Sequence, residues 1–212
     1  ARACDYLLAH PDRTAFVLAS EFSSLTFQAR DFGPTNVVAT ALFADGTAGM
    51  VLAGDAHPSA RLNSDPPACR LLRTHSHFVP DTLGAMGYDV ASTGLRLILD
   101  RRLPEFLQGR LRAVAADFVQ EAGFEWAQIT NFAIHPGGRR VLDVVADELS
   151  LDAEAQESSR GVLREHGNMS SATLLFVLQR SLARTPAGGA CLAIGFGPGF
   201  SIELSLWARP SR

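Results

Sequence analysis

One histidine stands at the end of an apolar run and directly before a tight turn. His135 follows Phe132–Ile134 and precedes Pro136, Gly137 and Gly138. Short apolar runs that end in Gly and Pro are typical of buried strands, and open α/β sheets carry reactive groups at the carboxyl ends of their strands. An imidazole in that place can exchange protons or donate a hydrogen bond near neutral pH. A polar loop residue is the alternative interpretation.

A second candidate precedes an apolar helix that we expect over residues 170–182. Asn168 would bring a side-chain amide to the positive end of the helix dipole. The simpler interpretation is an ordinary N-cap, which stabilises a helix by about 1 kcal/mol. Together, His135 and Asn168 could donate hydrogen bonds to one carbonyl oxygen. Such a pair would stabilise an enolate or a tetrahedral oxyanion.

Alternating apolar strands and helices position these two residues, which predicts an α/β fold with a largely buried sheet. We expect one helix to begin near Pro104 and to run to Gly123, because its apolar residues recur at intervals of three and four. The other expected helices cover residues 1–9, 37–43, 141–149, 157–165 and 170–182. The expected strands are residues 14–19, 48–53, 71–79, 94–99, 132–134, 190–196 and 201–207.

Composition excludes several classes of protein. The 212 residues are 47% hydrophobic and carry a formal charge of −3, which argues against nucleic acid or an anionic membrane as a partner. No apolar run reaches the length of a membrane helix, and the three cysteines are too scattered for disulfides or zinc, so we expect a cytoplasmic protein. His75 and His77 share one strand face without a third ligand nearby, and we predict no metal site. The absence of lysine is typical of a GC-rich bacterial genome.

Three segments resemble the signature motifs of type III polyketide synthases, the chalcone-synthase-like enzymes. They are His135–Gly138, Gly167–Ala172 and Gly195–Gly199, and they occur in the order of that family. Ser20–Glu21, Thr26–Phe27 and residues 41–46 are also similar, so the resemblance spans essentially the whole chain. It implies a thiolase-like fold of αβαβα layers and a homodimer. It also implies condensation of a starter acyl-CoA with malonyl-CoA, without a cofactor or a metal.

The resemblance assigns His135 and Asn168 to a Cys-His-Asn triad. The cysteine of the family would lie just before Ala1, so we expect the chain to be a fragment that lacks most of an N-terminal half and is inactive alone. Residues 1–64 would end that half and residues 65–212 would form the C-terminal half, with a linker around residues 55–67. Cys4, Cys69 and Cys191 are interpreted as packing residues.

The resemblance also assigns the substrate pocket. Phe43 falls at a gatekeeper position, and Leu97 falls at a second one where the family has an aromatic ring. Thr26, Ser170 and Pro198 would line the cavity, as would Tyr88 by a looser match, and Arg140 would contact CoA or lie in solvent. Phe43 and Leu97 could instead be ordinary core residues. If both assignments hold, we expect a preference for aliphatic starters.

Two other interpretations remain open. A β-ketoacyl-carrier-protein synthase of type III shares the implied fold and triad, but its typical His-Gln-Ala-Asn segment is replaced here by His135-Pro-Gly-Gly. A non-catalytic thiolase-like subunit would explain the missing cysteine, although it would not explain why His135 and Asn168 are both present.

Overall fold

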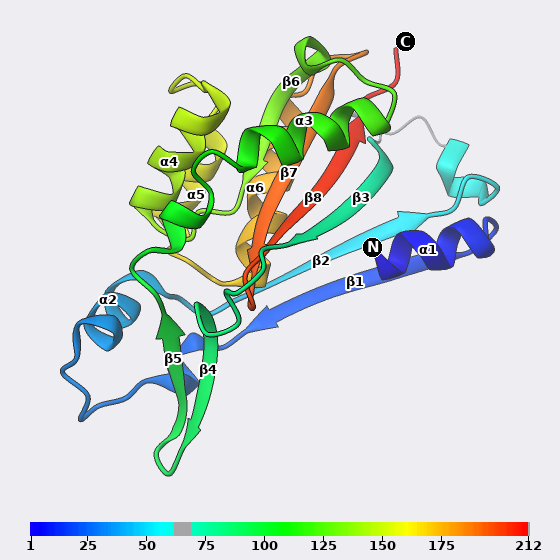
Figure 1. Ribbon diagram of the computed structural model, residues 1–212. Coiled ribbons are helices and arrows are strands. Elements are labelled where there is room, and N and C mark those ends of the chain that lie inside the picture. Colours follow the sequence, from blue (N-terminus) through cyan, green and yellow to red (C-terminus); the bar gives the residue numbers. More distant parts are fainter. Residues whose placement is uncertain (62–68, 212) are drawn as a thin grey trace.

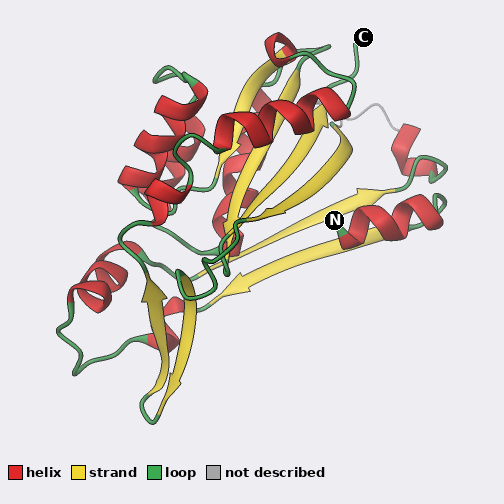
Figure 2. Cartoon of the chain, in the orientation of Figure 1, coloured by secondary structure: helices red, strands yellow, loops and turns green. Residues whose placement is uncertain are grey.

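The computed structural model describes residues 1–61 and 69–211. The helices are α1 (Arg2–Ala9), α2 (Pro34–Leu42), α3 (Leu111–Glu121), α4 (Arg139–Leu149), α5 (Glu157–His166) and α6 (Ser171–Arg184). The strands are β1 (Thr14–Glu21), β2 (Gly46–Ala53), β3 (Arg70–Phe78), β4 (Met86–Ala91), β5 (Gly94–Leu99), β6 (Ile129–Ile134), β7 (Ala190–Gly197) and β8 (Ser201–Ala208). Figure 1 shows their arrangement along the chain, and Figure 2 shows the same view by secondary structure.

A four-stranded mixed sheet in the order β3-β8-β7-β6 forms the centre of the molecule. β6 runs parallel to β7, whereas β8 is antiparallel to both β7 and β3. The large side chains of the sheet, such as Leu192 and Ile194, pack with residues of α3 and α4 in one core cluster. The small side chains of the other face, such as Ala133 and Ala193, pack with residues of α6. Small residues on that face let the helix approach the sheet closely.

Among the described strands, β1 and β2 form a second sheet, which packs on the opposite side of α6. Its inner residues, among them Ala19, Ala48 and Met50, join the core cluster around that helix. Four layers therefore follow one another: α3 with α4, the large sheet, α6, and the β1–β2 pair (Figure 1). The outer face of the β1–β2 pair carries Phe16 and Val51, which are 66% and 67% exposed.

A hairpin of β4 and β5 extends beyond the end of the two sheets (Figure 1). It contacts α2 and the short 3₁₀ helix η1 (Ser23–Thr26). The sequence predicted β5, but it did not predict β4, in which Gly87 and Asp89 interrupt the apolar pattern. Pairing with β5 over the full length of the hairpin compensates for this weak local preference.

The predicted helix from Pro104 to Gly123 is wrong as one element. The structure has a 3₁₀ helix, η3 (Leu103–Phe106), followed by turns and then by α3. Gly109 adopts a φ of +66°, a left-handed conformation that ends regular helix. Its N–H donates to the Glu148 carboxylate instead of to a helical carbonyl. The leucine stripe is still buried, because the two short helices turn the same residues toward the sheet.

The proposed boundary between residues 64 and 65 lies outside the described residues. None of the helices in residues 1–61 and 69–211 is long and apolar enough to cross a membrane.

Candidate functional site

His135 lies directly after β6, at the carboxyl end of the parallel strand pair. Its N–H donates to the Ile194 carbonyl of β7 at 2.8 Å, and its own carbonyl accepts from Gly137 at 3.0 Å. One residue earlier, the Ile134 N–H donates to the fully buried Ser159 hydroxyl of α5. Because β6 is an edge strand of the sheet, that hydroxyl replaces a missing strand partner. The backbone on which the imidazole stands is therefore held from both sides.

The surroundings of His135 favour a neutral imidazole near pH 7. Burial lowers the pKa of His135 to about 4, because the charged imidazolium would lose its hydration. Among the residues that the structure describes, none forms a hydrogen bond with either ring nitrogen, and desolvation is the one cause of the lowered pKa. A neutral imidazole has one N–H donor and one acceptor nitrogen, so this ring can donate one hydrogen bond to an oxygen or accept a proton.

Asn168 is 2% exposed and is joined to the segment that follows α2. Its N–H donates to the Leu42 carbonyl, and its carbonyl accepts from the Ala44 N–H, both at 2.9 Å. The side-chain Oδ1 accepts the Ser170 N–H at 2.9 Å. Within residues 1–61 and 69–211, no hydrogen bond uses Nδ2. The amide oxygen is therefore occupied by a hydrogen bond within the protein, and the amide nitrogen remains available as a donor.

The prediction that Asn168 is the N-cap of the following helix is wrong. Helix α6 begins at Ser171, and its N-cap is Ser170. Asn168 is instead paired with Phe43 in an isolated parallel β-bridge. Ser170 has a φ of +49°, an uncommon conformation for a residue with a side chain. Strained backbone of this kind persists where the surroundings hold it, and it is frequent at functional sites.

Both candidate donors lie close to one segment, Leu42–Ala44. Asn168 forms its two backbone hydrogen bonds there, and a Cβ placed on Gly138 of the His135 turn would lie 3.6 Å from Leu42 Cδ2. The tertiary fold thus brings the two turns to the same short stretch of chain. Convergence of the two side chains on a single oxygen stays a prediction.

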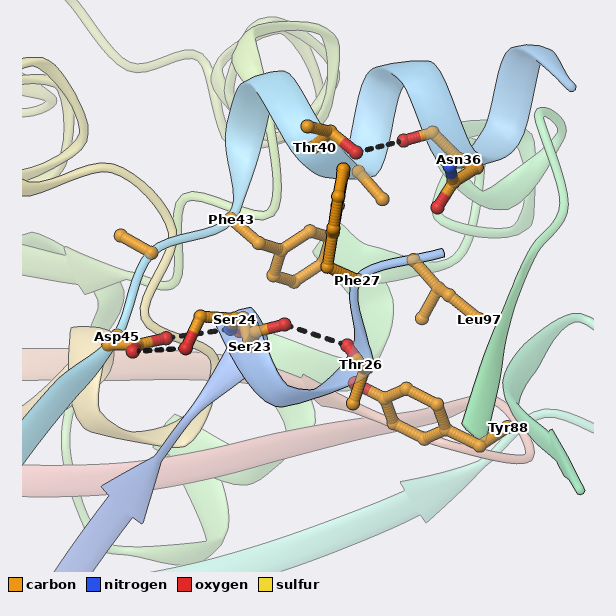
Figure 3. A pocket seen from close by; sticks show the side chains of 12 residues that line it. Ser23, Ser24, Thr26, Phe27, Asn36, Thr40, Phe43, Asp45, Tyr88 and Leu97 are labelled. Atoms are coloured by element: carbon orange, nitrogen blue, oxygen red, sulfur yellow. Dashed lines mark hydrogen bonds between the residues drawn. The ribbon is translucent and has the colours of Figure 1, made fainter. Parts of the chain in front are cut away.

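A cavity of about 390 Å³ opens beside this segment. Four residues that the resemblance assigned to a substrate pocket line it: Thr26, Phe43, Tyr88 and Leu97. Figure 3 shows α2 and Phe43 on one side of the cavity, with η1 and Tyr88 on the other. Thr26 donates its hydroxyl to the Ser23 carbonyl at 2.9 Å. Tyr88 and Leu97 face each other as a registered pair of the β4–β5 hairpin.

Polar residues that the sequence analysis did not single out also line the cavity. Asn36 and Thr40 come from one face of α2, and the Thr40 hydroxyl donates to the Asn36 carbonyl at 2.8 Å. Ser24 donates to the Asp45 carboxylate through its N–H and its hydroxyl, which lowers the pKa of Asp45. The spacing of Asn36 and Thr40 on a helix could have indicated a shared polar face. The Ser24–Asp45 contact joins distant segments and has no local signal in the sequence.

The tyrosine of the cavity is perturbed by its surroundings. Burial raises the pKa of Tyr88, and the Glu21 carboxylate raises it further by repelling a phenolate. Glu21 itself accepts a hydrogen bond from the Ser171 hydroxyl at the start of α6. The phenol therefore stays protonated and presents an uncharged ring and hydroxyl to the cavity.

Three other candidates do not line the cavity. Ser170 stands at the start of α6, and Pro198 is exposed in the turn between β7 and β8. Arg140 is exposed in the first turn of α4, with Nη2 3.7 Å from the Glu105 carboxylate. Surface ion pairs of this kind contribute little to stability. In this structure, Arg140 therefore lies in solvent, which is one of the two alternatives that we considered for it.

The cysteines are unsuited to nucleophilic attack in their present surroundings. Burial raises the pKa of the Cys69 thiol and, more strongly, that of Cys191. A nucleophilic cysteine needs the opposite shift, because the thiolate is the reactive form. In the part of the chain that the structure describes, no group of three or more His, Cys, Asp or Glu side chains could hold a metal ion.

The layered arrangement is that of the thiolase-like α/β fold, as solved structures show. The structure is similar to 1,3,6,8-tetrahydroxynaphthalene synthase from Streptomyces coelicolor A3(2), a bacterial type III polyketide synthase, with a TM-score of 0.88 and 32% identity. That match covers 100% of this chain and 58% of the other. PKS-I from the brown alga Ectocarpus siliculosus gives a TM-score of 0.87 at 26% identity, covering 98% of this chain and 56% of the other. The fold predicted from the sequence is confirmed.

The sequence comparison identifies the family. Residues 70–208 match the family of chalcone and stilbene synthases, C-terminal domain. The 1,3,6,8-tetrahydroxynaphthalene synthase of Streptomyces peucetius subsp. caesius is 36% identical over 207 residues, which are 97% of this chain and 54% of that protein. The chain belongs to the chalcone and stilbene synthase family, and it spans about half the length of the curated relatives that it matches.

Proposed function

We propose that the full-length protein is a type III polyketide synthase that extends a starter acyl-CoA with malonyl-CoA. Family membership supports the reaction class. The single observation that carries the proposal is the state of Asn168, whose Oδ1 is held by the Ser170 N–H while Nδ2 has no partner within the described residues. A buried amide oriented in this way is suited to donate to a substrate oxygen.

In the proposed reaction, His135 and Asn168 hold the thioester oxygen of malonyl-CoA. The bond to the carboxylate breaks, carbon dioxide leaves, and the electron pair forms an enolate whose oxygen accepts the two hydrogen bonds. The enolate carbon then attacks the thioester carbonyl of a starter bound to a cysteine, and the carbon–sulfur bond breaks to release the thiolate. That cysteine would come from outside these 212 residues. The neutral state of His135 supports its role as a donor to the enolate.

A cysteine thiolate next to His135 would alter the charge of the ring. The negative sulfur would raise the pKa of the imidazole from about 4, and the imidazolium would in turn lower the pKa of the thiol. The two groups would titrate as a pair, with the ion pair favoured during loading of the starter. Decarboxylation would follow once the sulfur is acylated and neutral.

The cavity supports a preference for aliphatic starters. Leu97 presents an aliphatic wall where the resemblance implies a ring, and the exposed Val90 and partly buried Met86 flank Tyr88 along β4. Phe43 lines the cavity and pairs through its backbone with Asn168, so its side chain would separate the acyl chain from the donors. The proposal includes a homodimer, no cofactor, and CoA thioesters as the only substrates.

The test is to incubate the full-length protein with malonyl-CoA and a series of starters from hexanoyl-CoA to palmitoyl-CoA. We expect triketide or tetraketide products, detected by mass spectrometry, and release of carbon dioxide. The control is a His10→Ala variant. His10 is an exposed histidine directly after α1, and its loss should leave full activity. Products formed only from acyl groups on a carrier protein would indicate a carrier-protein synthase. Absence of decarboxylation with every starter would leave a non-catalytic subunit as the explanation.

A further inference from the structure

Gln28 is a buried polar residue behind the wall of the cavity. It follows η1, is 9% exposed, and is not among the residues that line the cavity. Buried amides are found where they satisfy backbone groups that would otherwise lose their hydration. The contacts of Gln28 therefore indicate what the residue holds in place.

The side chain of Gln28 reaches the tip of the β4–β5 hairpin. Its Nε2 donates to the Leu95 carbonyl at 3.1 Å, with longer contacts of 3.4 Å to the Thr93 carbonyl and 3.5 Å to the Thr26 carbonyl. Gly94, between the two hairpin acceptors, turns the chain with a φ of +109°. A Cβ at Gly94 would lie 3.9 Å from Nε2, so the amide lies directly against the hairpin turn.

The backbone of Gln28 is tied to a third element. Its carbonyl accepts from Asn36 Nδ2 at 3.0 Å, and the same Nδ2 donates to the Asp31 carbonyl at 2.7 Å. Asn36 belongs to α2 and lines the cavity. One residue thus connects the segment after η1, helix α2 and the β4–β5 hairpin, which together form the walls of the cavity.

The hairpin depends on such a connection because it has no other strand as a partner. β4 and β5 pair only with each other among the described strands. A two-stranded hairpin is marginally stable by itself in water. Val90, near its tip, is 83% exposed. Tyr88 and Leu97 of the hairpin line the same cavity as Phe43, so the position of the hairpin affects the shape of that cavity.

We propose that Gln28 is a positioning residue that holds the β4–β5 hairpin against η1 and α2, and so sets the width of the cavity. Loss of its amide N–H groups releases the hairpin tip and moves the Tyr88–Leu97 wall outward. The cavity then accepts longer acyl chains. The link to acyl-chain length rests on the proposed function, whereas the link to the hairpin does not.

The first experiment measures the hairpin itself by amide hydrogen exchange of the full-length protein. Gln28→Met keeps the length of the side chain and removes both donors, and Gln28→Glu keeps its shape but faces carbonyl oxygens with a carboxylate. We expect amides of residues 88–98 to exchange on the order of 10-fold faster in both variants, as the loss of a hydrogen bond implies. The control Gln120→Glu, at an exposed position of α3, should leave this exchange unchanged. Unchanged exchange in the Gln28→Met variant overturns the proposal.

The second experiment compares kcat/KM for palmitoyl-CoA and hexanoyl-CoA. We expect the ratio to rise roughly threefold or more in Gln28→Met, since small changes of an apolar pocket alter selectivity by such factors. Decarboxylation of malonyl-CoA alone should not change. Faster exchange with an unaltered ratio overturns the role in selectivity. If the unaltered protein turns over no acyl-CoA, the proposed function fails, and the exchange data still decide whether Gln28 holds the hairpin.

Discussion

The two sheets differ in how their faces are covered. At β7, in the middle of the four-stranded sheet, both faces are buried, and Cys191, Leu192, Ala193 and Ile194 are each 1% exposed or less. In the β1–β2 pair, the same kind of apolar residues alternate, but one face is exposed, with Phe16 at 66% and Leu18 at 60%. Strands β1 and β7 are similarly apolar, so the difference between them arises from the helices that pack on their faces within these 212 residues.

The comparison separates two roles in the proposed site. The covered region, formed by the four-stranded sheet and helices α3 to α6, contributes His135 and Asn168 on firmly held backbone. The less covered region contributes Thr26 and Phe43, and the docked hairpin contributes Tyr88 and Leu97. Rigid packing suits hydrogen-bond donors that must reach the same substrate oxygen, whereas a cavity wall tolerates variation in shape. Substitutions in the first set should abolish the reaction, and those in the second should alter which starter is used.

The largest effect is expected for the imidazole of the covered region. His135→Ala in the full-length protein should lower decarboxylation of malonyl-CoA on the order of 10³-fold, because a donor and proton acceptor is lost. Release of labelled carbon dioxide measures this step without condensation. Circular dichroism should show an unchanged fold. Decarboxylation at the rate of the unaltered protein would contradict the assigned role.

A core substitution tests the contrast between the two sheets directly. Leu192→Ala on β7 should lower the free energy of unfolding by ~2–5 kcal/mol, since it leaves a cavity between the sheet, α3 and α4. Phe16→Ala on β1 is the matched variant on the exposed face and should change stability by about 0.5 kcal/mol or less in the chain of 212 residues. Urea denaturation measures both. Equal losses of unfolding free energy in the two variants would mean that the outer face of the β1–β2 pair is covered in solution, for example by another copy of the chain.

The amide of Asn168 permits a separation of structure from chemistry. Asn168→Asp keeps an oxygen for the Ser170 N–H but replaces the unpaired Nδ2 donor, so the fold should persist while extension falls on the order of 10²-fold. Steady-state product formation measures the loss, and thermal unfolding serves as its control. A drop in melting temperature with unchanged activity per folded molecule would assign Asn168 a structural role only.

The smallest effect is a pH dependence that originates in the covered region. In the folded chain of 212 residues the pKa of His135 is about 4, and it is near 6.5 when the chain is unfolded, so the unfolded state binds more protons between these values. Stability is therefore fully present above pH 6.5 and decreases as the pH falls toward 4. Between pH 7 and 5 the contribution is roughly 1–2 kcal/mol. His135→Gln should be more acid-resistant than the unaltered protein by that amount in denaturant titrations at pH 5, and equal loss in both proteins would refute the burial of a neutral ring.

Much of the secondary structure followed from local patterns. The run Phe132–Ile134 before Pro136 predicted β6 and its turn, and the apolar character of residues 174–178 predicted a buried helix. That this helix, α6, lies between the two sheets was shown only by the structure. The Asn168 N-cap was wrong because a local rule was applied to a residue that pairs across the molecule with Phe43. The continuous helix after Pro104 was wrong because Gly109 satisfies its N–H at Glu148, a partner in another element.

The sequence alone determined the strand–helix alternation, the family resemblance and the identities of His135 and Asn168 as the candidate donors, because these depend on residue types and short spacings. The resemblance proposed a set of pocket residues, and only the tertiary structure decided which of them share one cavity. Thr26, Phe43, Tyr88 and Leu97 line it, whereas Ser170, Pro198 and Arg140 do not. The role of Gln28 in joining the cavity walls also came from the structure alone. Those contacts join residues up to some 70 positions apart. Loop closure and packing select such pairs, and no local periodicity encodes them.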